Sequence, residues 1–210
     1  LQQTIKDLKP TSVLDVGCHG WRLTDICERV GAELIGADTS EPQGRPANAR
    51  FFKMVGATIQ TPSHTHVDLV VANHVIEHMT DPVALAVTLC RLAKPGGHVW
   101  IEAPSELSAS PIGTNRPESH DFTNFWDDPT HVRPWTPGAL YRLAIGVRLY
   151  PLAIKRSMAG TIPVVQMLAR KPLDGAQFDK QSRYVTLKDV PAGAGAAFKH
   201  VWGVDAAFGD

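Results

Sequence analysis

Short apolar runs alternate with amphipathic segments along the first half of this chain. Residues 13–16, 34–37 and 67–72 are hydrophobic runs of the kind that forms buried parallel strands. Residues 23–30 and 82–93 carry apolar side chains at helical spacing, with glycine or proline at their ends. This alternation of strand and helix predicts an α/β fold built on a parallel sheet.

The remaining segments extend the same pattern. The elements expected there are the end of a helix at 1–10, an irregular connection or short helix at 39–49, strands at 50–55 and 99–103, a helix at 137–145, and an antiparallel strand pair at 147–156 and 162–170 joined by 157–161. Between residues 93 and 99, Lys94-Pro95-Gly96-Gly97 is typical of a helix stop followed by a tight turn.

The stretch at 12–21 organises the rest of the chain. It reads Ser-Val-Leu-Asp-Val-Gly-Cys-His-Gly-Trp, so a buried strand runs into a turn at Gly17 and Gly20. A helix and a second strand follow, and that strand ends in Asp38. Strand, glycine turn, helix, strand and terminal acid is the order of a nucleoside-binding βαβ unit, in which the final carboxylate accepts hydrogen bonds from the ribose.

The residues of this turn separate two classes of ligand. A dinucleotide fold requires Gly-x-Gly-x-x-Gly, with free amides for a pyrophosphate, whereas this turn has a single glycine pair. Asp15, inside the first strand, would repel a pyrophosphate but can hold the ammonium group of an amino-acid tail. An adenosine that carries an amino-acid tail is S-adenosylmethionine (SAM).

Three motifs resemble those of the class I SAM-dependent methyltransferases, of the type 11 and type 23 kind. They are Val-Leu-Asp-Val-Gly-Cys at 13–18, His-Val-Ile-Glu-His-Met-Thr-Asp-Pro at 74–82, and Leu-Ala-Lys-Pro-Gly-Gly at 92–97. The resemblance covers residues 12–170. It implies a doubly wound, mostly parallel seven-stranded sheet in the order 3-2-1-4-5-7-6, with helices on both faces and an inserted substrate loop.

The resemblance also implies the cofactor and the residues that hold it. The cofactor is S-adenosyl-L-methionine, and the product is S-adenosyl-L-homocysteine (SAH). The positions that match the family's cofactor site are Asp15, Gly17, Cys18, His19, Gly20, Asp38, Thr39, Ala57, Thr58, Asn73 and His74.

The chain departs from the family pattern at three positions. His19 and Trp21 stand where the motif usually has glycine, and Ala57 stands where the family usually has an aspartate for the adenine amino group. These departures keep open a pseudoenzyme or regulatory module with a degenerate SAM site. An NAD(P)-dependent enzyme is a further alternative, because it shares the strand-turn-helix and Asp38.

Residues 104–137 form a long proline-rich insert after the fifth predicted strand, at the place where this fold carries its substrate loop. The expected substrate-binding residues are Trp126, Asp127, Asp128, Arg133 and Trp135. Arg133 suits an anionic acceptor, or alternatively an internal salt bridge to Asp127 or Asp128. The acceptor expected from the resemblance is an oxygen or nitrogen of a small molecule or sugar.

Methyl transfer from a sulfonium is an in-line displacement, and a protein base is needed only where the acceptor must lose a proton. His131 is the first candidate for this base, since Asp127 and Asp128 stand beside it to orient it. Its alternative role is to fasten the insert through hydrogen bonds. His74 is the second catalytic candidate, while His78 is expected to pack or cap.

Composition adds limits on partners. Among 210 residues, 21 basic and 21 acidic side chains give a net charge of zero, which offers no electrostatic case for nucleic acid or an anionic membrane. No apolar run is long enough to span a bilayer. Three cysteines without metal-ligand spacing favour a cytoplasmic protein.

Two sets of side chains offer candidate metal ligands, His64, His66 and Asp68, and Asp127, Asp128 and His131. Neither is specific, and the sequence predicts no metal. We expect a methyltransferase domain at 1–170, followed at 171–210 by an extension that acts as a lid, a dimer arm or a tail. The oligomeric state, a homodimer included, stays open.

Overall fold

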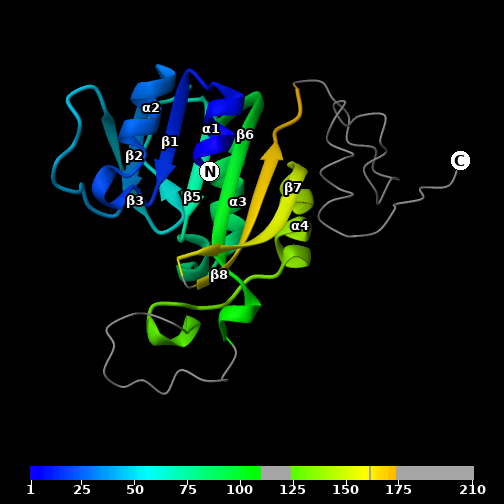
Figure 1. Ribbon diagram of the computed structural model, residues 1–210. Helices are drawn as coiled ribbons and strands as arrows, with labels where there is room; N and C mark the ends of the chain where they lie inside the picture. Colours follow the sequence, from blue (N-terminus) through cyan, green and yellow to red (C-terminus); the bar gives the residue numbers. More distant parts are fainter. Residues whose placement is uncertain (110–123, 161, 174–210) are drawn as a thin grey trace, which may run out of the picture.

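A single mixed sheet of eight strands forms the framework of the protein in a computed structural model, which describes residues 1–109, 124–160 and 162–173 (Figure 1). The strands are β1 Ser12–Val16, β2 Glu33–Asp38, β3 Arg50–Val55, β4 Thr58–Ile59, β5 Val67–Asn73, β6 Ala93–Pro104, β7 Tyr150–Ala159 and β8 Ile162–Arg170. The α-helices are α1 Gln2–Leu8, α2 Thr24–Val30, α3 Pro82–Leu92 and α4 Pro137–Gly146. Four short 3-10 helices are η1 His19–Trp21, η2 Ile76–His78, η3 Glu106–Ala109 and η4 Phe125–Asp127.

The strand order is β4-β3-β2-β1-β5-β6-β8-β7. Without β4, this is the predicted order 3-2-1-4-5-7-6, so the doubly wound fold class is confirmed. The predicted number of strands is too low by one. Residues 58–59, expected to belong to a turn, pair antiparallel with the end of β3, with Met54 opposite Ile59 and Val55 opposite Thr58. A two-residue hairpin strand has too few positions to show an alternating pattern in sequence.

Two boundaries also differ from the prediction. β6 begins at Ala93, opposite Val67 of β5, and the Lys-Pro-Gly-Gly stretch forms an irregularity within this pairing rather than a turn that precedes the strand. β7 begins at Tyr150 and runs through Ala159, so most of the connection predicted at 157–161 pairs with β8. The insert at 104–137 is irregular where it is described, whereas residues 110–123 and the predicted extension beyond residue 173 lie outside the described part.

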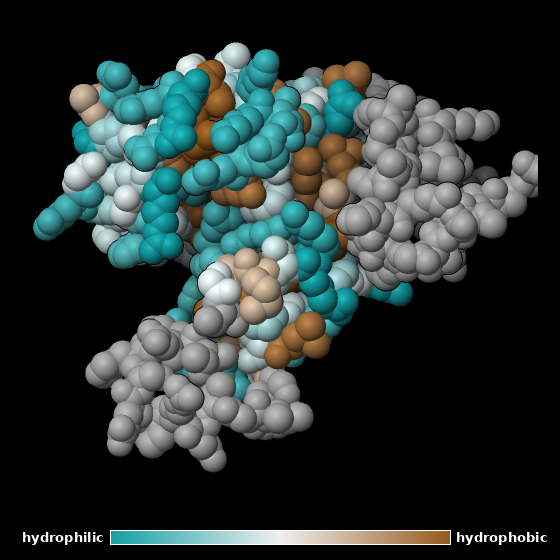
Figure 2. All heavy atoms as spheres, in the orientation of Figure 1, coloured by the Kyte–Doolittle hydropathy of each residue, from teal (hydrophilic) through white to brown (hydrophobic). Residues whose placement is uncertain are grey.

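Helices cover both faces of the sheet, and each face has its own hydrophobic core. On one face, Leu85 and Leu89 of α3 and Leu140 of α4 join side chains of the central strands in the larger core. On the other face, Ile5 of α1 and Ile26 of α2 belong to the smaller core. The face turned toward the viewer in Figure 2 is mainly hydrophilic, with the hydrophobic residues gathered in limited areas. Among the described helices, none has the length and hydropathy needed to cross a membrane.

The carboxylate of Asp68 ties together the amino ends of three neighbouring strands. One of its oxygens accepts hydrogen bonds from the backbone amides of Thr11 and Ser12 at 2.9 and 3.0 Å, and from both of their hydroxyls. The other oxygen pairs with Lys94 Nζ at 2.7 Å. Partial burial alone would raise the pKa of Asp68, but the hydrogen bonds from Lys94, Thr11 and Ser12 outweigh burial and hold this pKa well below its usual range.

Asp68→Asn is expected to lower the free energy of unfolding by about 1–3 kcal/mol at pH 7, because the charge-assisted hydrogen bonds that join β5 to the starts of β1 and β6 are weakened. A depressed pKa stabilises the fold above the ordinary carboxyl pKa, and this contribution is lost as pH falls. Urea denaturation should therefore show a difference between variant and wild type that shrinks below about pH 4. Asp25→Asn, at a side chain that is 84% exposed, is the control. An equal loss in both variants would show that Asp68 has no special role.

Candidate active site

The parallel strands end at one edge of the sheet, and the residues predicted to bind the cofactor collect there. Asp15 lies near the end of β1, Asp38 ends β2, and Asn73 ends β5 opposite Glu102 of β6. Figure 1 shows the insert on the same side of the sheet, beyond the end of β6. Ligands of doubly wound sheets bind outside the carboxyl ends of the strands, so this edge is the candidate site.

Two carboxylates lie on neighbouring strands at this edge. Asp15 is 5% exposed and stands opposite Gly36 of β2. Burial, and then the negative charge of Asp38, raise the pKa of Asp15 to about 7, and Arg22 offsets only part of this effect. Oδ1 of Asp38 accepts hydrogen bonds from the backbone amide of Thr39 at 2.7 Å and from its hydroxyl at 3.3 Å. An ammonium group beside Asp15 would relieve the cost of burying this carboxylate, and this fits the amino-acid tail of SAM.

The turn after β1 requires glycine at position 17 for two reasons. Gly17 has φ +73°, and a Cβ atom there would lie 2.5 Å from Cγ2 of Val75. Its amide donates to the carbonyl of Ala37 at 2.7 Å, and the amide of Cys18 donates to the same oxygen at 3.3 Å. The turn is therefore held against the ends of both neighbouring strands.

Trp21 stands where the family motif usually has glycine, but its side chain does not lie at the edge where the strands end. Its indole is 5% exposed, belongs to the smaller core, and meets the ring of Phe51 edge-on. It lies so close to Gly36 that a Cβ atom there would be 2.5 Å from Trp21 Cζ3 and 2.7 Å from Cys18 Sγ. Cys18 is thus also directed into this core, and at position 18 only backbone faces the turn. His19 and Gly20 are exposed.

The positions expected to border the adenine lie in the hairpin between β3 and β4. Ala57 is half-buried against the larger core, and Thr58 is exposed. Gly56, with φ +56°, makes the hairpin turn. These residues stand at the carboxyl end of β3, which is the next strand after the one that ends in Asp38.

His74 is held between two carboxylates just after β5. Its Nδ1 lies 3.1 Å from Oε1 of Glu77, and its Nε2 lies 3.4 Å from Oε1 of Glu102. Hydrogen bonds to Glu102, and then to Glu77, raise the pKa of His74 to about 9 despite partial burial. His74 therefore carries a positive charge at neutral pH and has no lone pair with which to accept a proton. Its neighbour Asn73 accepts a hydrogen bond from the Trp100 indole at 3.0 Å.

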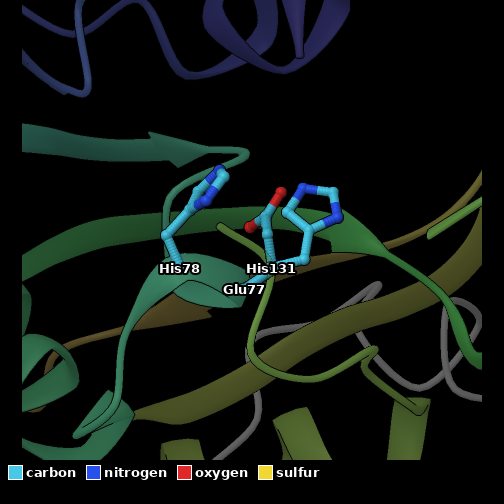
Figure 3. A group of neighbouring side chains, drawn as sticks. All are labelled: Glu77, His78 and His131. Atoms are coloured by element: carbon cyan, nitrogen blue, oxygen red, sulfur yellow. The ribbon is translucent and has the colours of Figure 1, made fainter. Parts of the chain in front are cut away.

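His131 lies over η2, next to His78 and Glu77 (Figure 3). Its ring stacks on Phe125 with centroids 4.4 Å apart, and the His78 ring is 4.8 Å away. Nδ1 of His131 is 2.7 Å from the carbonyl oxygen of Phe125, so Nδ1 carries the hydrogen and Nε2 keeps its lone pair. The backbone of the insert is fastened here as well, because the amide of Val132 donates to the Glu77 carbonyl at 2.7 Å.

The residues predicted to bind the substrate are not gathered at one place. Asp127 caps η4 through the amide of Asn124, and Trp126 is 59% exposed. Asp128 accepts hydrogen bonds from the amide and hydroxyl of Thr130, which lower the Asp128 pKa, and its Oδ2 is 3.7 Å from His131 Nε2. Of the charged residues expected to face the acceptor, only Asp128 adjoins His131.

Two of the predicted substrate residues have other contacts. Arg133 donates to the carbonyl of Thr80 at 3.4 Å, which is neither of the roles expected from the sequence. Trp135 is 4% exposed and packs in the larger core, and its backbone joins Ser105 in an isolated bridge. An aromatic residue in a proline-rich insert gives no sign in sequence of whether it faces the core or the ligand.

Sequence reasoning did not identify two acids that contact His74 at the candidate site. Glu77 is completely buried beside His74, His78 and His131, and Glu102 forms the second contact of His74. A glutamate within a hydrophobic 3-10 turn and another near the end of a buried strand were the available signals, because a charged side chain is rarely buried without a partner.

A family model described as a methyltransferase domain matches residues 2–146 of the chain. The ubiquinone biosynthesis O-methyltransferase of Proteus mirabilis is 26% identical over 208 residues, covering 84% of this chain and 80% of the relative. That of Cereibacter sphaeroides (strain ATCC 17029) is 38% identical over 95 residues, covering 40% of this chain and 38% of the relative. The alignments with this and six further relatives of the same name cover 38–47% of the relatives' lengths.

Solved structures share the fold at low identity. A SAM-dependent methyltransferase from Methanosarcina mazei superposes with a TM-score of 0.65 at 16% identity, over 83% of this chain and 99% of that one. The 1,6-didemethyltoxoflavin-N1-methyltransferase of Burkholderia thailandensis, solved with S-adenosylhomocysteine, gives 0.59 at 18% identity, over 78% and 72%. The NAD(P)-dependent alternative is therefore set aside. The chain belongs to the methyltransferase domain family and is a class I, Rossmann-like SAM-dependent methyltransferase.

Proposed function

We propose that this protein transfers the methyl group of SAM to a hydroxyl oxygen of a small-molecule acceptor bound between the strand ends and the insert. The observation that carries this proposal is the position of His131 in the insert, with Nδ1 oriented by the Phe125 carbonyl; the insert lies beyond the strand ends at the edge of the sheet that carries Asp15 and Asp38. A hydroxyl must lose its proton during methylation, and His131 is the residue of this chain that acts on it. The names of the relatives, all O-methyltransferases, support oxygen over nitrogen.

The cofactor contacts follow from the edge of the sheet. Asp15 would hold the ammonium group of the amino-acid tail, and Asp38 the ribose hydroxyls. Backbone of the turn from Gly17 to Gly20 would border the tail, while Thr39, Ala57 and Thr58 would border the nucleoside. Asn73 and His74, after β5, would stand nearest the reacting end. When bound, SAM supplies the electrophilic methyl group, and the protein holds donor and acceptor in line.

The two histidines have different parts in this proposal. His74 is clamped as a cation by Glu77 and Glu102 and orients the groups around the acceptor. His131 is oriented by the hydrogen bond from its Nδ1 to the Phe125 carbonyl, and its Nε2 lies 3.7 Å from Oδ2 of Asp128. The substrate contacts proposed within the insert are therefore Asp128 and the exposed ring of Trp126.

The pseudoenzyme alternative depends on positions 19, 21 and 57. At position 21 the substitution changes the smaller core, since the indole fills the space above Gly36. At position 57 the loss of an aspartate removes about one charge-assisted hydrogen bond to adenine, on the order of 1.5–3 kcal/mol. Neither change removes Asp15 or Asp38, and the proposal of an active methyltransferase rests on those two residues being present.

Asp15→Asn is expected to weaken SAH binding at least tenfold at pH 8, since an ammonium partner is lost. The same substitution should stabilise the ligand-free protein. Because the pKa of Asp15 is raised in the folded state, ionisation of this carboxyl lowers the free energy of unfolding as pH rises from about 4 to about 7. An amide at position 15 does not ionise and avoids this loss. The gain is on the order of 2–4 kcal/mol at pH 8 and vanishes near pH 4. Calorimetry and urea denaturation measure the two effects, and a destabilised variant at pH 8 would show that burial of the Asp15 carboxylate carries no such penalty.

Asp38→Ala is expected to weaken SAH binding at least tenfold, about 1.4 kcal/mol or more, because two ribose hydroxyls lose their acceptor. The fold should lose little stability, since the hydrogen bonds that this carboxylate accepts within the described residues come from the adjacent Thr39. Isothermal titration of variant and wild type with SAH provides the measurement. An unchanged dissociation constant would remove Asp38 from the site.

Incubation with methyl-labelled SAM and a set of small phenols, catechols and sugars should give O-methylated product, and His131→Ala should slow turnover about 10²–10⁴-fold. SAH affinity should stay within about twofold of wild type, since His131 touches the acceptor side only. His64→Ala, in an exposed turn, is the control. SAH binding without transfer to any acceptor would favour the pseudoenzyme, and unchanged turnover in His131→Ala would reduce this residue to a structural role.

A further inference from the structure

We infer that Glu77, His78 and His131 form a binding site for a divalent transition-metal ion of the zinc type, with coordination positions left open toward the acceptor. In the described part of the chain, this is the one group of three such side chains whose ligand atoms lie close together, all within 4.8 Å of one another. The binding of the ion does not depend on the proposed function, whereas its role in the reaction rests on it.

Glu77 supplies an unused ligand atom. The side chain is completely buried, and Oε1 is occupied by Nδ1 of His74 at 3.1 Å. Oε2 is also buried but has no hydrogen-bond partner among the described residues. A buried carboxylate oxygen without a donor is costly, so the great majority of such atoms are paired in native proteins. In Figure 3 the carboxylate lies between the rings of His78 and His131, and a cation there would give Oε2 its partner.

The hydrogen bonds of both imidazoles leave the same nitrogen available. His131 donates from Nδ1 to the Phe125 carbonyl. His78 Nδ1 lies 2.9 Å from the hydroxyl oxygen of Thr130, and that hydroxyl gives its only hydrogen to Asp128. Nδ1 of His78 is therefore the donor, and Nε2 keeps its lone pair. Metal-binding histidines characteristically donate their second ring N–H to a carbonyl or a hydrogen-bonded oxygen in this way.

The geometry suits a tetrahedral ion after a small closure. Bonds of about 2.0–2.1 Å to zinc place neighbouring ligand atoms about 3.3 Å apart, so side chains now within 4.8 Å must approach by roughly 1.5 Å at most. Two imidazoles and one carboxylate favour zinc, iron, cobalt or manganese over magnesium or calcium, which prefer oxygen ligands. Three protein ligands with open positions are the arrangement of a catalytic rather than a structural site.

The charges around the cluster favour a cation overall. Asp128 Oδ2, 3.7 Å from His131 Nε2, faces the cluster from the insert. The charge of His74 opposes the binding of a cation, and the carboxylate of Glu102 in β6 offsets that charge. The ligands come from two segments, η2 and the insert, so an ion would also fasten the insert to the strand ends.

An ion at this place would bind the acceptor hydroxyl and make its proton easier to lose. With the ion bound, Nε2 of His131 is a metal ligand and no longer serves as the base that it would be in the metal-free protein. The acceptor O–H then releases its proton to solvent, the oxygen forms a bond to the methyl carbon, and the S–CH₃ bond breaks with its electron pair left on sulfur. SAH is the other product.

Titration of the metal-free full chain with Zn²⁺ in a calorimeter, and with Co²⁺ by visible absorption, tests the site. We expect one ion per chain, and an intense tetrahedral-type Co²⁺ spectrum. His78→Ala and His131→Ala should each weaken Zn²⁺ binding at least a hundredfold, while Thr130→Val, which removes an outer contact, should weaken it about 10–100-fold. His64→Ala and His66→Ala, on exposed residues, should change nothing.

Glu77→Gln tests the buried carboxylate as a ligand, and circular dichroism shows whether this variant folds. If Glu77→Gln does not fold, the His78→Ala and His131→Ala variants decide the test. Zn²⁺ binding of unchanged strength in His78→Ala and His131→Ala, or no binding by the wild type, would overturn the inference. Methyl transfer that persists at an undiminished rate in a chelator, without bound Zn²⁺, overturns the role of the ion in the reaction and leaves the proposed function standing. Zn²⁺ binding without methyl transfer to any acceptor overturns the proposed function and leaves the metal site standing.

Discussion

The left-handed turn at Gly17 is the constraint on which the remainder of the site depends. Its backbone conformation, its hydrogen bond to Ala37 and the lack of a Cβ atom that would collide with Val75 bring the ends of β1, β2 and β5 to one place. A side chain at this position would separate the turn from the segment that follows β5. The spacing between Asp15, Asp38 and His74 is therefore set by backbone packing, and the chemistry at the edge follows from it.

The same edge concentrates negative charge. Asp15, Asp38, Glu77 and Glu102 approach it from four strand ends, while His74 is the cation held among them. Such an arrangement is costly without a bound ligand, as the raised pKa of Asp15 shows. A cofactor that carries both an ammonium and a sulfonium group is attracted to this field, and the product, which lacks the sulfonium charge, is held less strongly.

Much of the fold was predictable because its signals are local. Buried strands, helix stops and the acid after β2 can each be identified within a window of about ten residues, and together they predicted an α/β fold on a parallel sheet. The strand order was implied by the family resemblance. The hairpin strand β4, the packing of Trp21 on Gly36 and the burial of Trp135 were not, because each depends on a partner distant in sequence. The cluster of Glu77, His78 and His131 joins segments more than fifty positions apart, and only the fold brings them together.

The contact between Trp21 and Gly36 also limits which segments of this protein can be exchanged with those of related enzymes. An indole above a bare backbone is a volume-matched pair, so exchanging either residue alone leaves a void or an overlap. A return to the usual glycine at position 21 would have to be accompanied by a larger residue in β2. The turn and the strand beneath it therefore pack as one unit, and chimaeras with related enzymes should keep their junctions outside residues 18–36.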